Sequence, residues 1–273
     1  MRRFTWFNAT SLSFGLAFLY LPMLILVIYS FNESKLVTVW AGFSTKWYGE
    51  LFQNEAFLDA AWVTVKVAVM SSTIASILGT MAAYVLVRGG RFKGRTLFSG
   101  MIYAPLVMPE VITGLSLLLL FIGIGLDRGV LTIVLAHTTF SMCYVSVVVS
   151  SRLVSFDRSL EEAALDLGCS PFEAFRLVTL PIIATAVISG WLLAFTLSLD
   201  DLVIASFTAG PSATTLPIKI FSAVRLGVSP EINALSTIMI SIVTVGVITA
   251  SLMSKRATVR QQREERAAER AAD

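Results

Sequence analysis

The chain has 273 residues, of which 56% are hydrophobic and 14% are charged, and its formal net charge at pH 7 is +3. Soluble domains carry about 45–50% apolar and about 25% charged residues, so a soluble fold of this composition would expose more apolar surface than water tolerates. The composition argues against a soluble enzyme, a disordered chain and a nucleic-acid-binding protein, and it favours an all-α membrane protein surrounded by lipids.

Six apolar segments predict six transmembrane helices, because a helix needs about 20 mostly apolar residues to cross a bilayer. The first segment is expected to be retained as an anchor, since its apolar part is longer than the roughly 7–15 residues of a signal peptide. The third contains Pro105 and Pro109, which predict a kink or a break in that helix. In chain order the segments cover residues 12–31, 60–87, 97–122, 130–150, 182–202 and 232–253.

The distribution of lysine and arginine sets the predicted orientation. Most of these residues fall before the first segment, between the second and third, between the fourth and fifth, and after the sixth. This pattern predicts that both termini lie in the cytoplasm and that residues 254–273 form a cytoplasmic tail. On the opposite side, the apolar residues 203–209 predict a re-entrant or interfacial segment, which protein must cover because unpaired backbone in lipid is costly.

The longest internal cytoplasmic loop predicts two short helices joined at an angle. Ser159 with Glu162, and Ser170 with Glu173, have the spacing of capping boxes that begin helices. Gly168 stands where a glycine would end the first of these helices. The apolar positions of both helices fall on one side, so the pair packs either on its own bundle or on another protein.

This loop, residues 151–181, resembles the EAA loop of ABC importer permeases, a pattern in which isoleucine stands where this chain has Val178. The resemblance implies that residues 1–273 form a single transmembrane permease domain of the type I ABC importer fold. It also implies that the loop inserts into a groove of an ATP-binding subunit. The residues that carry the motif, and the coupling role that it implies, are Glu162, Ala163, Ala164, Gly168, Leu180 and Pro181.

Other stretches are similar to the polyamine permeases of spermidine and putrescine importers, most of all to the second permease subunit of putrescine importers. They include residues 29–32, 47–48, 105–114 and 195–201. The resemblance implies a multi-pass protein of the bacterial inner membrane that carries no cofactor and catalyses no reaction. It implies as partners a polyamine, a second and different permease, a periplasmic substrate-binding protein, and two ATP-binding subunits that hold ATP and Mg²⁺.

Three acidic residues fall inside the predicted spans, which predicts a negatively charged, water-accessible path. Glu110 in the third segment, and Asp200 with Asp201 in the fifth, all lie toward the outer side. A carboxylate inside the bilayer costs about 2.5–3.5 kcal/mol on insertion scales, so it normally faces a cavity or a partner. A diamine suits such a path, because its ammonium ends favour carboxylates and aromatic faces. Trp47, otherwise an interfacial anchor, supplies an aromatic face if it reaches the mouth.

Structural interpretations of the same residues stay open. Glu110 could instead bond backbone groups freed by the neighbouring proline, or pair with Lys66, and the two adjacent aspartates could order the segment that follows them. Ser198 is included in the predicted solute path, although a serine in a span more often makes a hydrogen bond between helices. His137, the single histidine, is expected to be packed and paired within the bundle.

The sequence contains one stretch that resembles a nucleotide site, and it leaves two other functions to consider beside the permease. Residues 89–96 imitate a phosphate-binding loop, but arginine replaces its lysine and no strand precedes it, so ATP must bind another chain. The alternative function is an ATP-independent secondary transporter or channel for organic cations, which the EAA spacing argues against. An intramembrane aspartyl protease is rejected, because its GxGD motif does not occur in the sequence.

Overall fold

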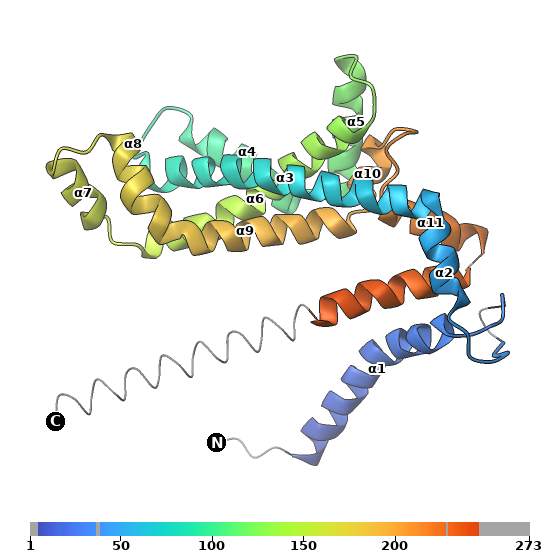
Figure 1. Ribbon diagram of the computed structural model, residues 1–273. Coiled ribbons are helices and arrows are strands. Elements are labelled where there is room, and N and C mark those ends of the chain that lie inside the picture. Colours follow the sequence, from blue (N-terminus) through green and yellow to red (C-terminus); the bar gives the residue numbers. More distant parts are fainter. Residues whose placement is uncertain (1–4, 37–38, 228, 246–273) are drawn as a thin grey trace. The chain divides into compact units, whose positions relative to one another are not determined.

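The computed structural model describes residues 5–36, 39–227 and 229–245, and these form helices with one isolated bridge between Asn32 and Phe43 (Figure 1). The chain divides into two compact units, which are described separately. The terminal unit comprises residues 1–55 and 223–273, and the central unit comprises residues 56–222. The all-α prediction is confirmed for the described residues.

The terminal unit contains α1 (Trp6–Ser30), α2 (Lys46–Gln53) and a helix over Pro230–Val245. Its loop between α1 and α2 is ordered by Asn32, whose Nδ2 donates to the Val39 carbonyl (2.7 Å) and whose Oδ1 accepts from the Ala41 N–H (2.9 Å). Asn54 Nδ2 donates to Glu231 Oε2 at 3.1 Å, which ties the end of α2 to the helix that follows Pro230.

The central unit contains the remaining helices, in which the predicted spans are longer than expected or broken. They are α3 (Glu55–Arg88), α4 (Arg95–Val107), α5 (Glu110–Gly123), α6 (Val130–Ser155), α7 (Ser159–Asp166), α8 (Pro171–Ala174), the π-helix η1 (Phe175–Thr179), α9 (Leu180–Asp200), α10 (Val203–Thr208) and α11 (Leu216–Leu226).

Four helices among the described residues are long and apolar enough to cross a membrane: Trp6–Ser30, Glu55–Arg88, Val130–Ser155 and Pro171–Asp200. The bent pair α4 and α5 makes a fifth if it is one span. The predicted sixth span begins within Pro230–Val245, and its remainder lies outside the described residues, as does the tail 254–273. The number of spans and the sides of the termini stay predictions.

The third span is broken where the prolines predict a break. Between α4 and α5 the helix axis turns by 118°. Met108 is extended (ψ 136°) because the ring of the following proline disfavours a helical conformation, and Pro109 then precedes the first turn of α5. This turn leaves Glu110 at the start of a new helix rather than inside a continuous one.

The fifth helix begins eleven residues before the predicted start. Pro171–Asp200 is one continuous apolar helix, whereas the sequence predicted a span that follows Pro181. A proline lacks an N–H and clashes with the carbonyl four residues before it, which breaks a regular helix. Here the five residues before Leu180 form a π-helix, and this wider turn accommodates the proline without ending the helix.

The core of the central unit is centred on α6, which packs along α9 and contacts α4, α5 and α10. Small residues allow close approach to Val145. A Cβ added to Gly79 of α3 would lie 2.7 Å from the Met142 carbonyl oxygen and 2.8 Å from Val145 Cβ, and one added to Gly190 of α9 would lie 3.2 Å from Val145 Cγ1. In membranes, such small residues permit the backbone contacts that hold helices together.

The apolar segment 203–209 is covered by protein, as predicted, and its first six residues form the helix α10. In α10, Ile204, Ala205 and Thr208 are fully buried. The hydroxyl of Thr132 on α6 donates to the Thr208 carbonyl at 2.8 Å. Helix α10 packs on α5 and α6, so its backbone is shielded by the rest of the central unit.

Candidate functional site

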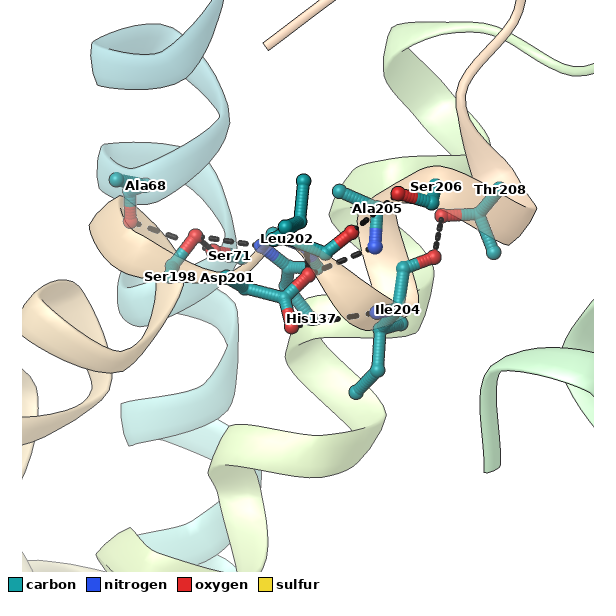
Figure 2. Close-up of polar contacts among 10 residues, drawn as sticks. All are labelled: Ala68, Ser71, His137, Ser198, Asp201, Leu202, Ile204, Ala205, Ser206 and Thr208. Atoms are coloured by element: carbon teal, nitrogen blue, oxygen red, sulfur yellow. Dashed lines mark hydrogen bonds and ion pairs between the residues drawn. The ribbon is translucent and has the colours of Figure 1, made fainter. Parts of the chain in front are cut away.

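The break between α9 and α10 is organised by the carboxylate of Asp201 (Figure 2). Asp201 ends α9 with extended backbone (ψ 119°). Its Oδ2 accepts the Ala205 N–H at 2.7 Å, and its Oδ1 accepts the Ile204 N–H at 3.3 Å. These N–H groups have no carbonyl partner in the first turn of a helix, so the carboxylate caps α10.

His137 on α6 lies against this cap and links it to two further helices. Its Nδ1 is 2.7 Å from Ser198 Oγ, and its Nε2 is 3.0 Å from Asp201 Oδ2. The hydroxyl of Ser71 on α3 donates to Ser198 Oγ at 3.1 Å. All four side chains are largely buried, and Figure 2 shows them converging from α3, α6 and the end of α9. We call this group the polar cluster (Ser71, His137, Ser198 and Asp201).

The polar cluster confirms that His137 is packed and paired within the bundle. It also shows Ser198 in a hydrogen bond between helices, and Asp201 ordering the segment that follows it. Buried polar groups are costly unless they have partners, so the cluster holds α10 in place. Ser198 and Asp201, which were predicted to line the solute path, thus make structural contacts.

Glu110 and Asp200 differ from Asp201 because both are exposed. The Glu110 carboxylate has no hydrogen bond or ion pair within the described parts of the chain, so a Glu110–Lys66 pair is not formed there. Glu110 is in the first turn of α5, where the helix dipole favours a negative charge. It precedes by one turn Gly114, whose Cα hydrogen faces Ile204 and Phe207 of α10 closely enough that a Cβ would clash.

Trp47 lies in the terminal unit, whereas the three acids lie in the central unit. Its side chain is 2% exposed. The indole N–H donates to the Asn32 carbonyl at 2.7 Å, and the Lys46 ammonium lies 4.6 Å from its ring centroid. The ring therefore supports the loop between α1 and α2.

The loop 151–181 has one of the two predicted capping boxes. Ser170 Oγ accepts the Glu173 N–H at 3.3 Å, and Glu173 Oε2 accepts the Ser170 N–H at 2.8 Å. This hydrogen bond from Ser170 lowers the pKa of Glu173 below its ordinary value. Gly168 (φ +92°) ends α7 as predicted.

The other predicted capping box, at Ser159, is wrong. The Ser159 N–H donates instead to Asp157 Oδ1 at 2.9 Å, and this bond lowers the pKa of Asp157. Glu162 pairs instead with Arg158, the residue before the first turn of α7, at 3.0 Å, and its N–H donates to the Arg158 carbonyl. Asp157 takes the Ser159 N–H that Glu162 would accept in a capping box, because its side chain is shorter and lies two residues from that N–H. Ser159 is therefore the first residue of α7, one position earlier than the predicted capping box would place the start of the helix.

The EAA motif places part of its residues inward and part outward. Ala164 is buried, Glu162 and Ala163 are exposed, and Leu180 with Pro181 begins α9. Apolar side chains are also exposed on this loop, including Leu160, Leu167, Phe172 and Leu177. Exposed apolar residues gathered on a helix pair of this kind are typical of a protein–protein contact.

The loop 151–181 also holds a buried ion pair, between Glu161 and Arg88, that was not predicted. Glu161 is buried and lies 3.0 Å from the Nε of Arg88, the last residue of α3. The sequence offered a weak signal: Glu161 is three residues before the buried Ala164, so it shares the inward face of α7. Arg88 was interpreted only as part of the positive charge on the cytoplasmic side.

A family model for the inner membrane component of binding-protein-dependent transport systems matches residues 75–260. The chain belongs to this family. It is 61% identical over 248 residues to the putrescine transport system permease protein PotI of Escherichia coli K12, with 88% of each chain covered. It is 43% identical to the spermidine/putrescine transport system permease protein PotC of the same strain, covering 89% of this chain and 91% of PotC.

The fold of these inner membrane components is also found in solved structures. A bacterial ABC transporter that imports alginate has a chain with a TM-score of 0.69 and 17% identity, covering 90% of this chain and 94% of that one. The same transporter with its periplasmic protein has a TM-score of 0.69 and 19% identity, covering 92% and 93%. The chain thus has the type I ABC importer permease fold. It is a multi-pass inner-membrane transport subunit, not an enzyme.

Proposed function

We propose that the chain is one of two permease subunits of an ATP-driven importer of putrescine, and that it forms half of the translocation pathway. The observation that carries the proposal is the 61% identity to PotI along most of both chains. The carboxylates of Glu110 and Asp200 are exposed and support a cationic solute. Glu110 lies one turn before Gly114, which packs on α10, and Asp200 directly precedes the capping residue Asp201.

A diamine has two ammonium groups separated by methylene groups. Carboxylates attract the ammonium groups, and the apolar side chains around a helix break receive the methylenes. In this proposal Glu110 and Asp200 meet the solute directly. Asp201 and Ser198 form the wall of the path by holding α10, and Trp47 supports the loop between α1 and α2.

ATP is expected to act on partner chains. The stretch that imitates a phosphate-binding loop is a turn closed by its own arginine, since Arg95 Nη2 donates to the Leu86 carbonyl at 2.6 Å and Nη1 donates to the Gly90 carbonyl. In this proposal two ATP-binding subunits hold ATP and Mg²⁺ and receive the loop 151–181. The contact is made by Glu162, Ala163 and the exposed apolar residues, while Ala164, Gly168, Leu180 and Pro181 shape the loop.

Reconstitution tests the class of transporter. The chain is placed in proteoliposomes with its candidate partner permease, periplasmic protein and ATP-binding chains, and uptake of labelled putrescine is measured with and without ATP. We expect uptake only when ATP and the ATP-binding chains are both present. Uptake without them would favour the secondary transporter or channel and reject the importer.

Substitution of single acids tests the solute path. Glu110→Gln and Asp200→Asn are expected to lower putrescine uptake while the complex still assembles. Asp127→Asn is the matched control, because Asp127 is an exposed acid in the loop between α5 and α6. If Glu110→Gln and Asp200→Asn take up putrescine as well as the Asp127→Asn control does, the two carboxylates do not meet the solute.

A further inference from the structure

Four segments of the chain meet at one buried ion pair on the cytoplasmic side of the central unit. Arg88 ends α3, and Glu161 lies in the first turn of α7. Arg88 Nε is 3.0 Å from Glu161 Oε2, and the two side chains are only 11% and 10% exposed. Residues 73 positions apart are thereby brought together where the loop 151–181 meets the bundle.

Two other polar atoms of the pair, one on each side chain, bind the segments that lead into and out of the loop. Arg88 Nη2 donates to the carbonyl of Phe156, where α6 ends, at 3.2 Å. The guanidinium carbon also lies 5.5 Å from the centroid of the Phe156 ring. On the other side, the Thr179 hydroxyl donates to Glu161 Oε1 at 2.7 Å. Thr179 is the last residue of η1, immediately before α9.

These contacts restrict how α7 can move. Its backbone is joined to α6 through an extended residue, Phe156, and to α8 through the turn at Gly168, so neither connection is a continuous helix. The exposed Arg158–Glu162 pair, with side chains 64% and 59% exposed, contributes little, because solvent-exposed pairs are weak. Separating the buried pair would instead leave a charge without its partner, which is strongly unfavourable.

We propose that Arg88 and Glu161 are positioning residues that transmit movement of the loop 151–181 to α3. This inference rests on the proposed function. Ser71 of the polar cluster lies 17 residues before Arg88 on the same helix, about 25 Å along its axis at about 1.5 Å per residue. A displacement of α7 by a partner subunit is therefore carried by α3 to the cluster that holds α10.

The test compares variants in the reconstituted importer by two readouts: the amount of assembled complex, and putrescine uptake per ATP hydrolysed. Arg88→Met and Glu161→Gln are expected to assemble and to hydrolyse ATP, but with uptake per ATP lowered about fivefold or more, as for loss of a typical coupling between sites. Arg88→Lys keeps the charge and should restore part of the ratio. Arg91→Gln, an exposed arginine of the adjacent loop, is the matched control and should leave it unchanged.

A purely structural pair would lower the amount of assembled complex and leave uptake per ATP at the wild-type value, and that result would overturn the proposal. If Arg88→Met and Glu161→Gln do not assemble, Thr179→Val decides, because it removes one hydrogen bond from Glu161 and leaves the ion pair. We expect a smaller fall in the same ratio, and an unchanged ratio would refute the transmitting role. Failure of the importer function itself would appear differently, as no ATP-driven uptake by the wild-type complex.

Discussion

The substitution Asp201→Asn tests whether Asp201 acts by capping α10 or by contacting the solute. In the native chain both carboxylate oxygens accept backbone N–H groups, Oδ2 from Ala205 at 2.7 Å and Oδ1 from Ile204 at 3.3 Å. An asparagine of the same shape has only one acceptor oxygen. Whichever way its amide turns, its NH₂ group faces a backbone N–H, and that donor loses its partner.

The size of the effect follows from the lost bond. A hydrogen bond to a charged group contributes about 1.5–3 kcal/mol, so we expect Asp201→Asn to lower the free energy of unfolding by about that amount. His137, whose Nε2 is 3.0 Å from Asp201 Oδ2, also loses its charged neighbour. Asp200→Asn changes an exposed acid next in sequence, and its effect should stay within about 0.5 kcal/mol.

Denaturant unfolding of the purified complex in nanodiscs, followed by tryptophan fluorescence, measures these differences. Putrescine uptake, normalised to the amount of assembled complex, is measured on the same preparations. We expect Asp201→Asn to shift the unfolding midpoint and Asp200→Asn to change uptake alone. An unchanged midpoint for Asp201→Asn, together with lost uptake, would refute the assignment of Asp201 to the cap and place it in contact with the solute.

Three further changes have defined outcomes. Gly210→Ala should prevent native packing, because its Cβ would lie 2.0 Å from the Arg128 carbonyl oxygen, and a strong loss of thermally stable complex would be measured by size-exclusion chromatography after heating. Gly168→Ala should cost about 1–2 kcal/mol through its left-handed backbone alone, since nothing lies within 4 Å of the added Cβ; a wild-type unfolding midpoint would contradict this. The capping contribution of Glu173, whose pKa is lowered from 4.5, is present above pH 4.5 and should be lost as the pH falls through the lowered value. Hydrogen exchange of residues 171–175, corrected for intrinsic rates, should then rise on acidification, and Glu173→Gln should abolish that pH dependence.

Local rules predicted much of the fold. Apolar length predicted the long helices, and the prolines of the third segment predicted its break, because both effects act within a few residues of the sequence. The capping box at Ser170 was predicted for the same reason. At Ser159 the same rule was wrong, because Asp157 offers a competing carboxylate and the pattern alone does not rank the two. Pro181 was interpreted as a helix start, since a π-helix before it leaves no clear sign in the sequence.

The contacts between helices could not be predicted in this way. His137, Ser198 and Asp201 were each identified singly, but their distances depend on how α6 and α9 cross, which no local pattern specifies. Arg88 and Glu161 were missed as a pair, because a charge beside a span has an adequate explanation in the positive-inside rule. Only the packing of α3 against the loop shows that this arginine is buried and has a partner.

The tight packing around Val145 limits the ways in which the bundle can rearrange. Two glycines, Gly79 and Gly190, approach this one side chain from α3 and α9, so there is no room for either helix to slide past α6 at that level. The helices can instead tilt about Val145, which changes the distance between them at both ends and leaves their distance at Val145 unchanged. A small tilt imposed at the end that carries the loop 151–181 would then appear with the opposite sign at the far end, which is a geometry suited to opening one side as the other closes.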